Sequence, residues 1–133
     1  MAKNTAIGHK RFWHSFRYAA QGIAWAFKSE LNMKVHTGVS VLVLIAAAVF
    51  RLPPASWLLL LLAITLVLTA ELLNTAIEAT IDLVSPDVHP LARVAKDTAA
   101  GAVLITAVFA IIAGIYVFYH PVMDWIRLYV IFE

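Results

Sequence analysis

Residues 98–119 of the chain have the sequence TAAGAVLITAVFAIIAGIYVFY and contain no charged side chain. A helix needs roughly 20 mainly apolar residues to cross the hydrocarbon core of a bilayer, and this run is long enough. Tyr116 and Tyr119 lie near its end, before His120 and Pro121, as is typical of a span that reaches the membrane interface. The run predicts a transmembrane helix over 98–119.

Two earlier apolar runs predict further spans, over residues 31–50 and 55–84. The first ends before Arg51-Leu52-Pro53-Pro54, and Lys34 near its start is expected to extend toward the lipid headgroups. The second begins behind Pro54, with Trp57 as an interface anchor, and ends before Ser85-Pro86. The predicted fold class is therefore an all-α integral membrane protein with three transmembrane helices.

The composition agrees with lipid as the solvent. Of the 133 residues, 62% are hydrophobic and 14% are charged, whereas soluble domains have about 45–50% and about 25%. The length suits one membrane domain over residues 1–133. The net charge of +2 does not indicate a nucleic-acid partner, and the absence of cysteine excludes disulfides and thiolate chemistry.

Residues 11–29 precede the first span and have a helical period of their own. Phe12, Phe16, Ile23 and Phe27 recur at helical spacing, with basic and polar residues between them. This pattern predicts an amphipathic helix that lies in the headgroup region. The alternative is a helix packed against the bundle.

The basic residues predict the orientation of the chain. Most of its 10 Lys and Arg residues precede the first span or lie in the second loop, and Lys and Arg collect on the cytoplasmic side of membranes. The N-terminus and the second loop are therefore expected in the cytoplasm. The residues that carry this inference are Lys3, Lys10, Arg11, Arg17, Lys28, Lys34, Arg93 and Lys96.

A polar stripe follows one face of the second predicted span. Glu71, Asn74, Glu78 and Asp82 are spaced i, i+3, i+7 and i+11 and fall within an arc of about 80° on a helix. Three carboxylates at a membrane boundary repel one another unless cations neutralise them, and Mg²⁺ is commonly held by carboxylates together with phosphates. The alternatives are a solvated face or buried polar pairs between helices.

Lys96 and Asp97 stand at the expected cytoplasmic start of the third span. A lysine at a helix N-terminus can neutralise a phosphate. Alternatively, Asp97 caps the helix and Lys96 extends to the headgroups. Glu30, a lone acid before the first span, is a weaker candidate ligand, and His36 and His89 are expected to make ordinary polar contacts.

The segment ELLNTAIEATID at 71–82, followed by AKDTAAGAV at 95–103, resembles the prokaryotic diacylglycerol kinase family over roughly residues 11–119. The resemblance implies a small three-span lipid kinase of the bacterial inner (plasma) membrane that forms a homotrimer. The segment His89-Pro90-Leu91-Ala92-Arg93 is more similar to the undecaprenol kinases of Gram-positive type. So is His36, which stands where the enterobacterial branch has a glutamate.

The resemblance also implies roles for individual positions. Two positions are matched to metal binding: Glu30 and Glu78, which hold Mg²⁺ with the ATP phosphates. The positions matched to nucleotide binding lie near the nucleotide and are Arg11, Asp82, Lys96 and Asp97. Those matched to catalysis are Glu71, the general base at the lipid hydroxyl, together with Asn74, Lys96 and Asp97.

The implied reaction is transfer of the γ-phosphate of Mg·ATP to the primary hydroxyl of a membrane lipid alcohol, with undecaprenol preferred over diacylglycerol. An assembly that conducts cations through acidic rings is the alternative from another class. It is disfavoured because Glu71 lies near the inner end of its span. The tail, residues 121–133, extends beyond the usual end of the family and has no assigned role.

Overall fold

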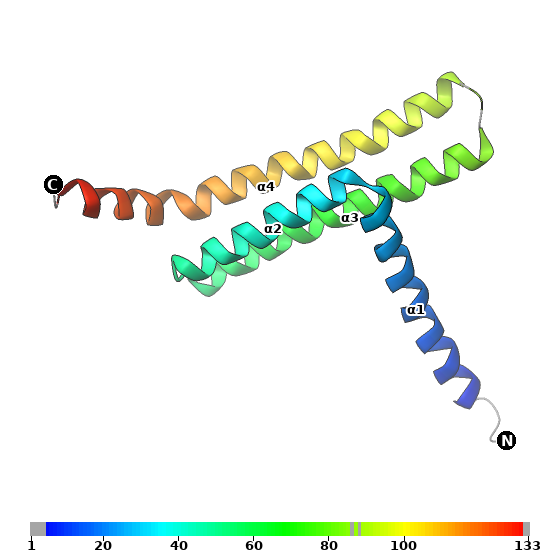
Figure 1. Ribbon diagram of the computed structural model, residues 1–133, viewed down its shortest axis with the longest axis horizontal. Helices are drawn as coiled ribbons and strands as arrows, with labels where there is room; N and C mark the ends of the chain where they lie inside the picture. Colours follow the sequence, from blue (N-terminus) through cyan, green and yellow to red (C-terminus); the bar gives the residue numbers. More distant parts are fainter. Residues whose placement is uncertain (1–4, 86, 88, 132–133) are drawn as a thin grey trace.

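The structure, a computed structural model, describes residues 5–85, 87 and 89–131, with side chains for 12–85, 87 and 89–128. Four helices make up this part of the chain: α1 (Thr5–Ser29), α2 (Leu31–Val49), α3 (Pro54–Val84) and α4 (Pro90–Ile131) (Figure 1). The last three are long and apolar enough to cross a membrane. The prediction of an all-helical, three-span membrane protein preceded by a further helix is confirmed.

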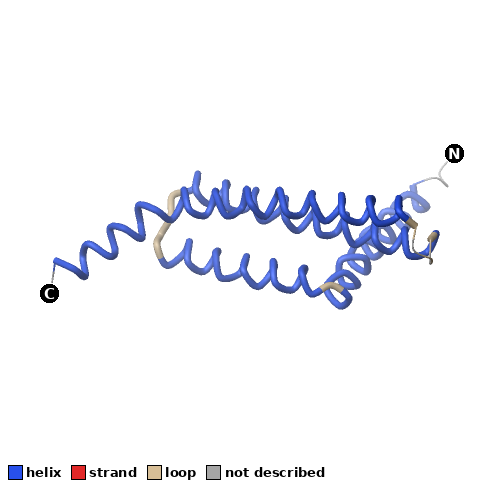
Figure 2. Tube along the Cα trace, turned by 90° about the horizontal axis from the view of Figure 1, so that it is seen from above, coloured by secondary structure: helices blue, strands red, loops and turns tan. Residues whose placement is uncertain are grey.

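A tight turn joins α2 to α3. Arg51 adopts a left-handed conformation with φ of 51°, and the Leu52 N–H donates to the Ala47 carbonyl at 3.0 Å. Pro54 then occupies the first turn of α3, where its missing N–H costs no helical hydrogen bond. The turn reverses the chain, so that α2 and α3 run side by side in opposite directions (Figures 1 and 2).

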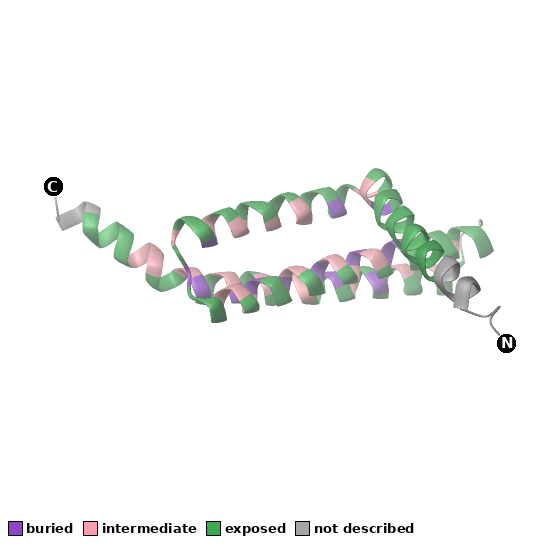
Figure 3. Ribbon diagram, turned by 90° about the horizontal axis from the view of Figure 1, so that it is seen from below, coloured by how far each residue is buried: buried purple, intermediate pink, exposed green. Residues whose placement is uncertain are grey.

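The central helix is α3, which packs along α4 and also contacts α2. Small buried residues on α4, including Ala99 and Ala113, permit the close approach of α3. Buried residues are few, and most of the helical surface is exposed (Figure 3). Large apolar side chains such as Leu104 and Ile105 face outward, as expected where lipid is the solvent.

The first helix projects away from the bundle, as Figure 1 shows. Its described side chains from Phe12 to Trp25 are exposed, and Ala26 near its C-terminal end is buried. At the corner between α1 and α2, the Lys34 Nζ donates to the Lys28 carbonyl at 3.1 Å. Over most of its described length α1 is therefore not packed along the bundle.

The fourth helix is longer than the predicted span at both ends. It begins at Pro90, not at Thr98, and continues through Pro121 to Ile131. The prediction that Lys96 and Asp97 stand at a helix N-terminus is therefore wrong, because they lie inside the helix. Apolar composition marks only the part of a helix that contacts lipid, whereas the helix itself continues into the polar region.

Candidate functional site

The polar stripe of α3 runs from the interior of the bundle to its surface. Glu71 is 1% exposed and Asn74 is 7% exposed. Glu78, one turn further on, is half-buried, and Asp82 is exposed. The predicted stripe therefore faces the neighbouring helices at Glu71 and opens to the surroundings toward the α3–α4 connection.

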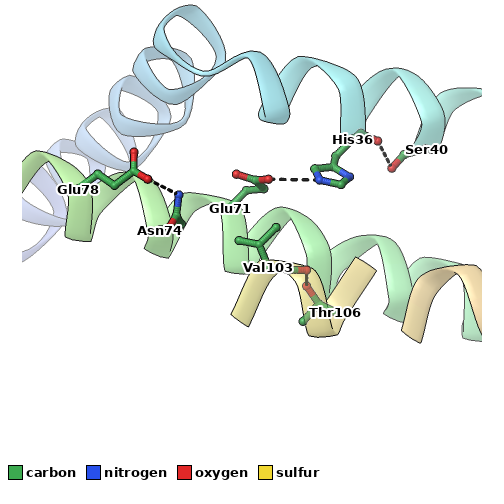
Figure 4. Close-up of polar contacts among 7 residues, drawn as sticks. All are labelled: His36, Ser40, Glu71, Asn74, Glu78, Val103 and Thr106. Carbon is green, nitrogen blue, oxygen red and sulfur yellow. Dashed lines mark hydrogen bonds and ion pairs between the residues drawn. The ribbon is translucent and has the colours of Figure 1, made fainter. Parts of the chain in front are cut away.

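His36 of α2 faces the most buried carboxylate. Its Nε2 lies 3.2 Å from Glu71 Oε1, and the two side chains point toward one another in Figure 4. The contact is an ion pair when the imidazole is protonated. The Ser40 Oγ donates to the backbone carbonyl of His36 at 2.7 Å, one turn earlier in α2. A buried carboxylate with one polar neighbour is well placed to accept a proton from a substrate.

Asn74 links the two inner carboxylates of the stripe. Its Nδ2 donates to Glu78 Oε1 at 3.1 Å across one helical turn (Figure 4). Within the described part of the chain, the Asn74 Oδ1 and the neighbouring Thr75 Oγ1 are buried without a hydrogen-bond partner. Buried polar atoms are normally paired, so these two oxygens are available to a ligand or to water.

Glu30 completes the acidic group from the corner between α1 and α2. It is half-buried and precedes α2 in an extended conformation, with no capping bond from its side chain. Glu30, Glu78 and His36 all lie close enough to act electrostatically on Glu71. Three carboxylates and one imidazole from α2, α3 and the α1–α2 corner therefore lie in one region of the bundle, although no three of the described side chains form a cluster that could hold a metal by themselves.

The remaining candidates lie further along α3 and α4. The Lys96 Nζ binds Asp82 Oδ1 and so ties α4 to α3. Asp97 pairs with Arg93 within α4, with 3.6 Å between Arg93 Nε and Asp97 Oδ2, and both side chains are exposed. Neither pair forms a hydrogen bond or an ion pair with Glu71 or Glu78 in the part of the chain that the structure describes. The side chain of Arg11 lies outside the described residues.

An apolar groove of about 370 Å³ lies beside the buried carboxylate, between α2, α3 and α4. His36 and Ser40 are its polar lining residues, and the remaining lining residues are aliphatic or glycine. His36 therefore borders both the groove and Glu71. A hydrocarbon chain lying in the groove would bring a terminal polar group near this carboxylate.

Sequence reasoning missed two residues of this site. His36 was expected to make an ordinary contact, and Thr75 was not singled out. The only available signals were that His36 replaces an acid of related sequences and that Thr75 adjoins Asn74. His89, by contrast, has a structural role, because its Nδ1 accepts from the Leu91 N–H at the start of α4.

The donor atoms at this end of the bundle are carboxylate, amide and hydroxyl oxygens, which suit a hard cation such as Mg²⁺. Among the described residues, no group of three or more His, Asp or Glu side chains could hold a metal unaided. Mg²⁺ commonly takes one or two carboxylates together with substrate phosphates. The residues present fit that kind of site, in which a nucleotide supplies the other ligands.

The fold and the site together define the class of a multi-pass membrane protein with a carboxylate-rich site at one end of three spans. Residues 17–118 match the prokaryotic diacylglycerol kinase family. The chain belongs to that family.

Individual relatives agree with this assignment. The chain is 42% identical to the undecaprenol kinase of Bacillus subtilis over 108 residues, which cover 81% of this chain and 88% of that protein. It is 46% identical to a diacylglycerol kinase of Synechocystis sp. over 101 residues, which cover 75% of this chain but 58% of that protein. It is also 34% identical to the diacylglycerol kinase of Escherichia coli K12 over 113 residues, covering 84% and 91%.

Proposed function

We propose that the protein is a lipid kinase that transfers the γ-phosphate of ATP to the primary hydroxyl of a membrane lipid alcohol, with undecaprenol as the preferred substrate. The observation that carries this proposal is the buried Glu71, which contacts His36 of the apolar groove and precedes the hydrogen-bonded Asn74–Glu78 pair on the same face of α3. The lipid alcohol therefore has an apolar groove, and ATP has a polar surface, near the same carboxylate.

Glu71 acts as the general base. Its carboxylate accepts the proton of the lipid hydroxyl while the hydroxyl oxygen forms a bond to the γ-phosphorus. The bond from that phosphorus to the β–γ bridging oxygen breaks, and ADP leaves with the electron pair. Positioning and charge stabilisation dominate phosphoryl transfer, so the contribution of the protein is to hold Glu71 toward the hydroxyl, and His36 supports it there.

Glu78 and Glu30 would hold Mg²⁺ together with the ATP phosphates, and the proximity of both carboxylates to Glu71 supports this assignment. When bound, Mg²⁺ neutralises phosphate charge and orients the transferred group. Asn74 orients Glu78 through its amide, and its Oδ1 is buried without a hydrogen-bond partner in the described part of the chain. The remaining candidates bind the nucleotide in this proposal. They are Asp82, Lys96 and Asp97, toward the polar end of the bundle, and Arg11.

The preference for undecaprenol rests on two observations. The match to the undecaprenol kinase of Bacillus subtilis covers most of both proteins. His36 stands in place of a glutamate, as in the undecaprenol kinases, and leaves the surroundings of Glu71 less acidic. The groove is almost wholly apolar, which suits a polyprenyl chain and an acyl chain alike. Diacylglycerol is the alternative substrate, since the relatives from Synechocystis sp. and Escherichia coli, which are 46% and 34% identical to this chain, are named diacylglycerol kinase.

The active assembly is a homotrimer in the bacterial plasma membrane, with the N-terminus in the cytoplasm. The distribution of Lys and Arg supports this orientation, which places the candidate site where ATP is available. The exposed state of Asp97 and Arg93 in a single chain is consistent with a site that a neighbouring subunit completes.

The test is incubation of the purified full-length protein with γ-labelled ATP and undecaprenol, diacylglycerol or ceramide in separate mixed micelles. We expect labelled undecaprenyl phosphate to form fastest, and only when Mg²⁺ is present. Faster labelling of diacylglycerol would reverse the substrate preference but leave the kinase intact. A protein inert toward all three lipids would refute the proposed function.

A further inference from the structure

The C-terminal end of α4 lies outside the region shared with the family, which ends at residue 118. α4 is 42 residues long, which at about 1.5 Å per residue gives roughly 63 Å. The hydrocarbon core of a bilayer is about 30 Å thick. A large part of α4 must therefore lie outside the hydrocarbon.

Contacts between the helices show where α4 passes the end of the two preceding spans. The α2–α3 turn marks the end of the two preceding spans, and the rings of Phe50 and Phe118 meet there with their centroids 6.1 Å apart. Val117 and Leu52 belong to the same buried cluster. Residues 117 and 118 of α4 therefore lie beside the α2–α3 turn. The last part of α4 extends beyond this turn, as Figure 1 shows.

The segment beyond the turn is too apolar for bulk water. Trp125 is 52% exposed, Ile126 41% and Leu128 58%. Asp124 and Arg127 are also exposed and form an ion pair, with 4.0 Å between Arg127 Nη1 and Asp124 Oδ1. At about 100° per residue, Trp125 and Ile126 lie on the side of the helix opposite this pair, whereas Leu128 lies about 40° from Asp124. One side of the segment is therefore apolar, and the other carries the ion pair beside Leu128.

Pro121 gives the segment a direction of its own. Proline has no N–H to donate to the carbonyl four residues earlier, and its ring crowds that carbonyl, so a helix bends there. In Figure 2 the last part of α4 runs obliquely to the rest of the helix. The bend turns the segment away from the axis of the bundle at the level where the hydrocarbon ends.

We propose that residues 121–131 form an interfacial helix on the membrane surface at the end of the bundle opposite the candidate site. Trp125 and Ile126 enter the boundary between headgroups and acyl chains, where tryptophan is favoured. The Asp124–Arg127 pair faces water. Because the two charges of this pair cancel, apolar burial holds the segment, and its partner is a lipid surface of any headgroup charge.

The chain contains no cysteine, so single-cysteine variants of the full-length protein can test this placement. Asp124→Cys, Ile126→Cys and Arg127→Cys each receive a nitroxide label in phosphatidylcholine vesicles. Collision rates with oxygen, which prefers lipid, and with a water-soluble nickel chelate are then measured by electron paramagnetic resonance. Leu104→Cys, at an exposed position within the span, provides the lipid-facing reference.

We expect the ratio of oxygen to nickel collisions at residue 126 to be severalfold higher than at residues 124 and 127 and to approach the value at residue 104. Vesicles containing phosphatidylglycerol should give the same pattern. High nickel collision rates at all three positions would place the segment in water and overturn the proposal. Low collision rates with both reagents at residue 126 would indicate burial against protein, such as a second copy, and would also overturn it.

Discussion

Replacing His36 tests whether a neighbouring side chain positions the proposed base. The His36 Nε2 lies 3.2 Å from Glu71 Oε1, and Glu71 is 1% exposed, so water cannot readily replace the imidazole. Glu71 Oε1 has no hydrogen-bond partner in the described part of the chain, so the imidazole is its polar contact, and losing the polar contact of a buried group costs about 1–3 kcal/mol. If that loss falls on the transition state, His36→Ala lowers kcat by about 5- to 160-fold. The KM for ATP should be unchanged, because His36 borders the groove and not the nucleotide region.

The assay is phosphorylation of undecaprenol by the purified protein over a range of ATP concentrations. His36→Gln retains a side-chain donor and should recover most of the lost kcat. Ser40→Ala is a matched control and should have little effect, since the Ser40 hydroxyl donates to the backbone carbonyl of His36 and not to its imidazole. Unchanged kcat in His36→Ala would refute this reasoning, as would equal loss in the alanine and glutamine variants.

Three further predictions concern the polar stripe and its partner on α4. Glu78→Gln should abolish lipid phosphorylation while the protein stays folded in detergent, as judged by circular dichroism; full activity would remove Glu78 from the metal site. Asn74→Leu removes the amide that donates to Glu78, and it should weaken Mg·ATP binding severalfold in calorimetry; unchanged affinity would contradict this role. Lys96→Asp should lower the stability of the protein by about 0.5–1 kcal/mol because the pair with Asp82 is partly exposed. Adding Asp82→Lys should restore thermal stability but not activity, and recovery of both would show that Lys96 has only a structural role.

The number and position of the spans could be predicted from the sequence because lipid contact requires long apolar runs. The predicted ranges 31–50 and 55–84 agree closely with α2 and α3. The ends of α4 could not be predicted in this way. Pro121 was interpreted as a terminator, yet the helix continues through it, since a single missing hydrogen bond bends a helix without ending it.

The polar stripe could be predicted from spacing alone, but its surroundings could not. Periodicity places Glu71 and Asp82 on one face of a helix without showing that the first is buried and the second exposed. The contact of His36 with Glu71 and that of Lys96 with Asp82 depend on how far one helix is shifted along another. Helix packing sets that register, and a single sequence contains no direct measure of it.

The most direct test of the account is to compare nucleotide binding and turnover in Glu71→Gln. The full-length variant in lipid nanodiscs should bind Mg·ATP with an affinity similar to that of the unmodified protein, because Glu78 and Glu30 remain. Its rate of undecaprenol phosphorylation should fall by about 10²- to 10⁴-fold, the contribution typical of a general base. Turnover at the unmodified rate would contradict the assignment of the buried carboxylate of α3 as the group that accepts the proton of the lipid hydroxyl.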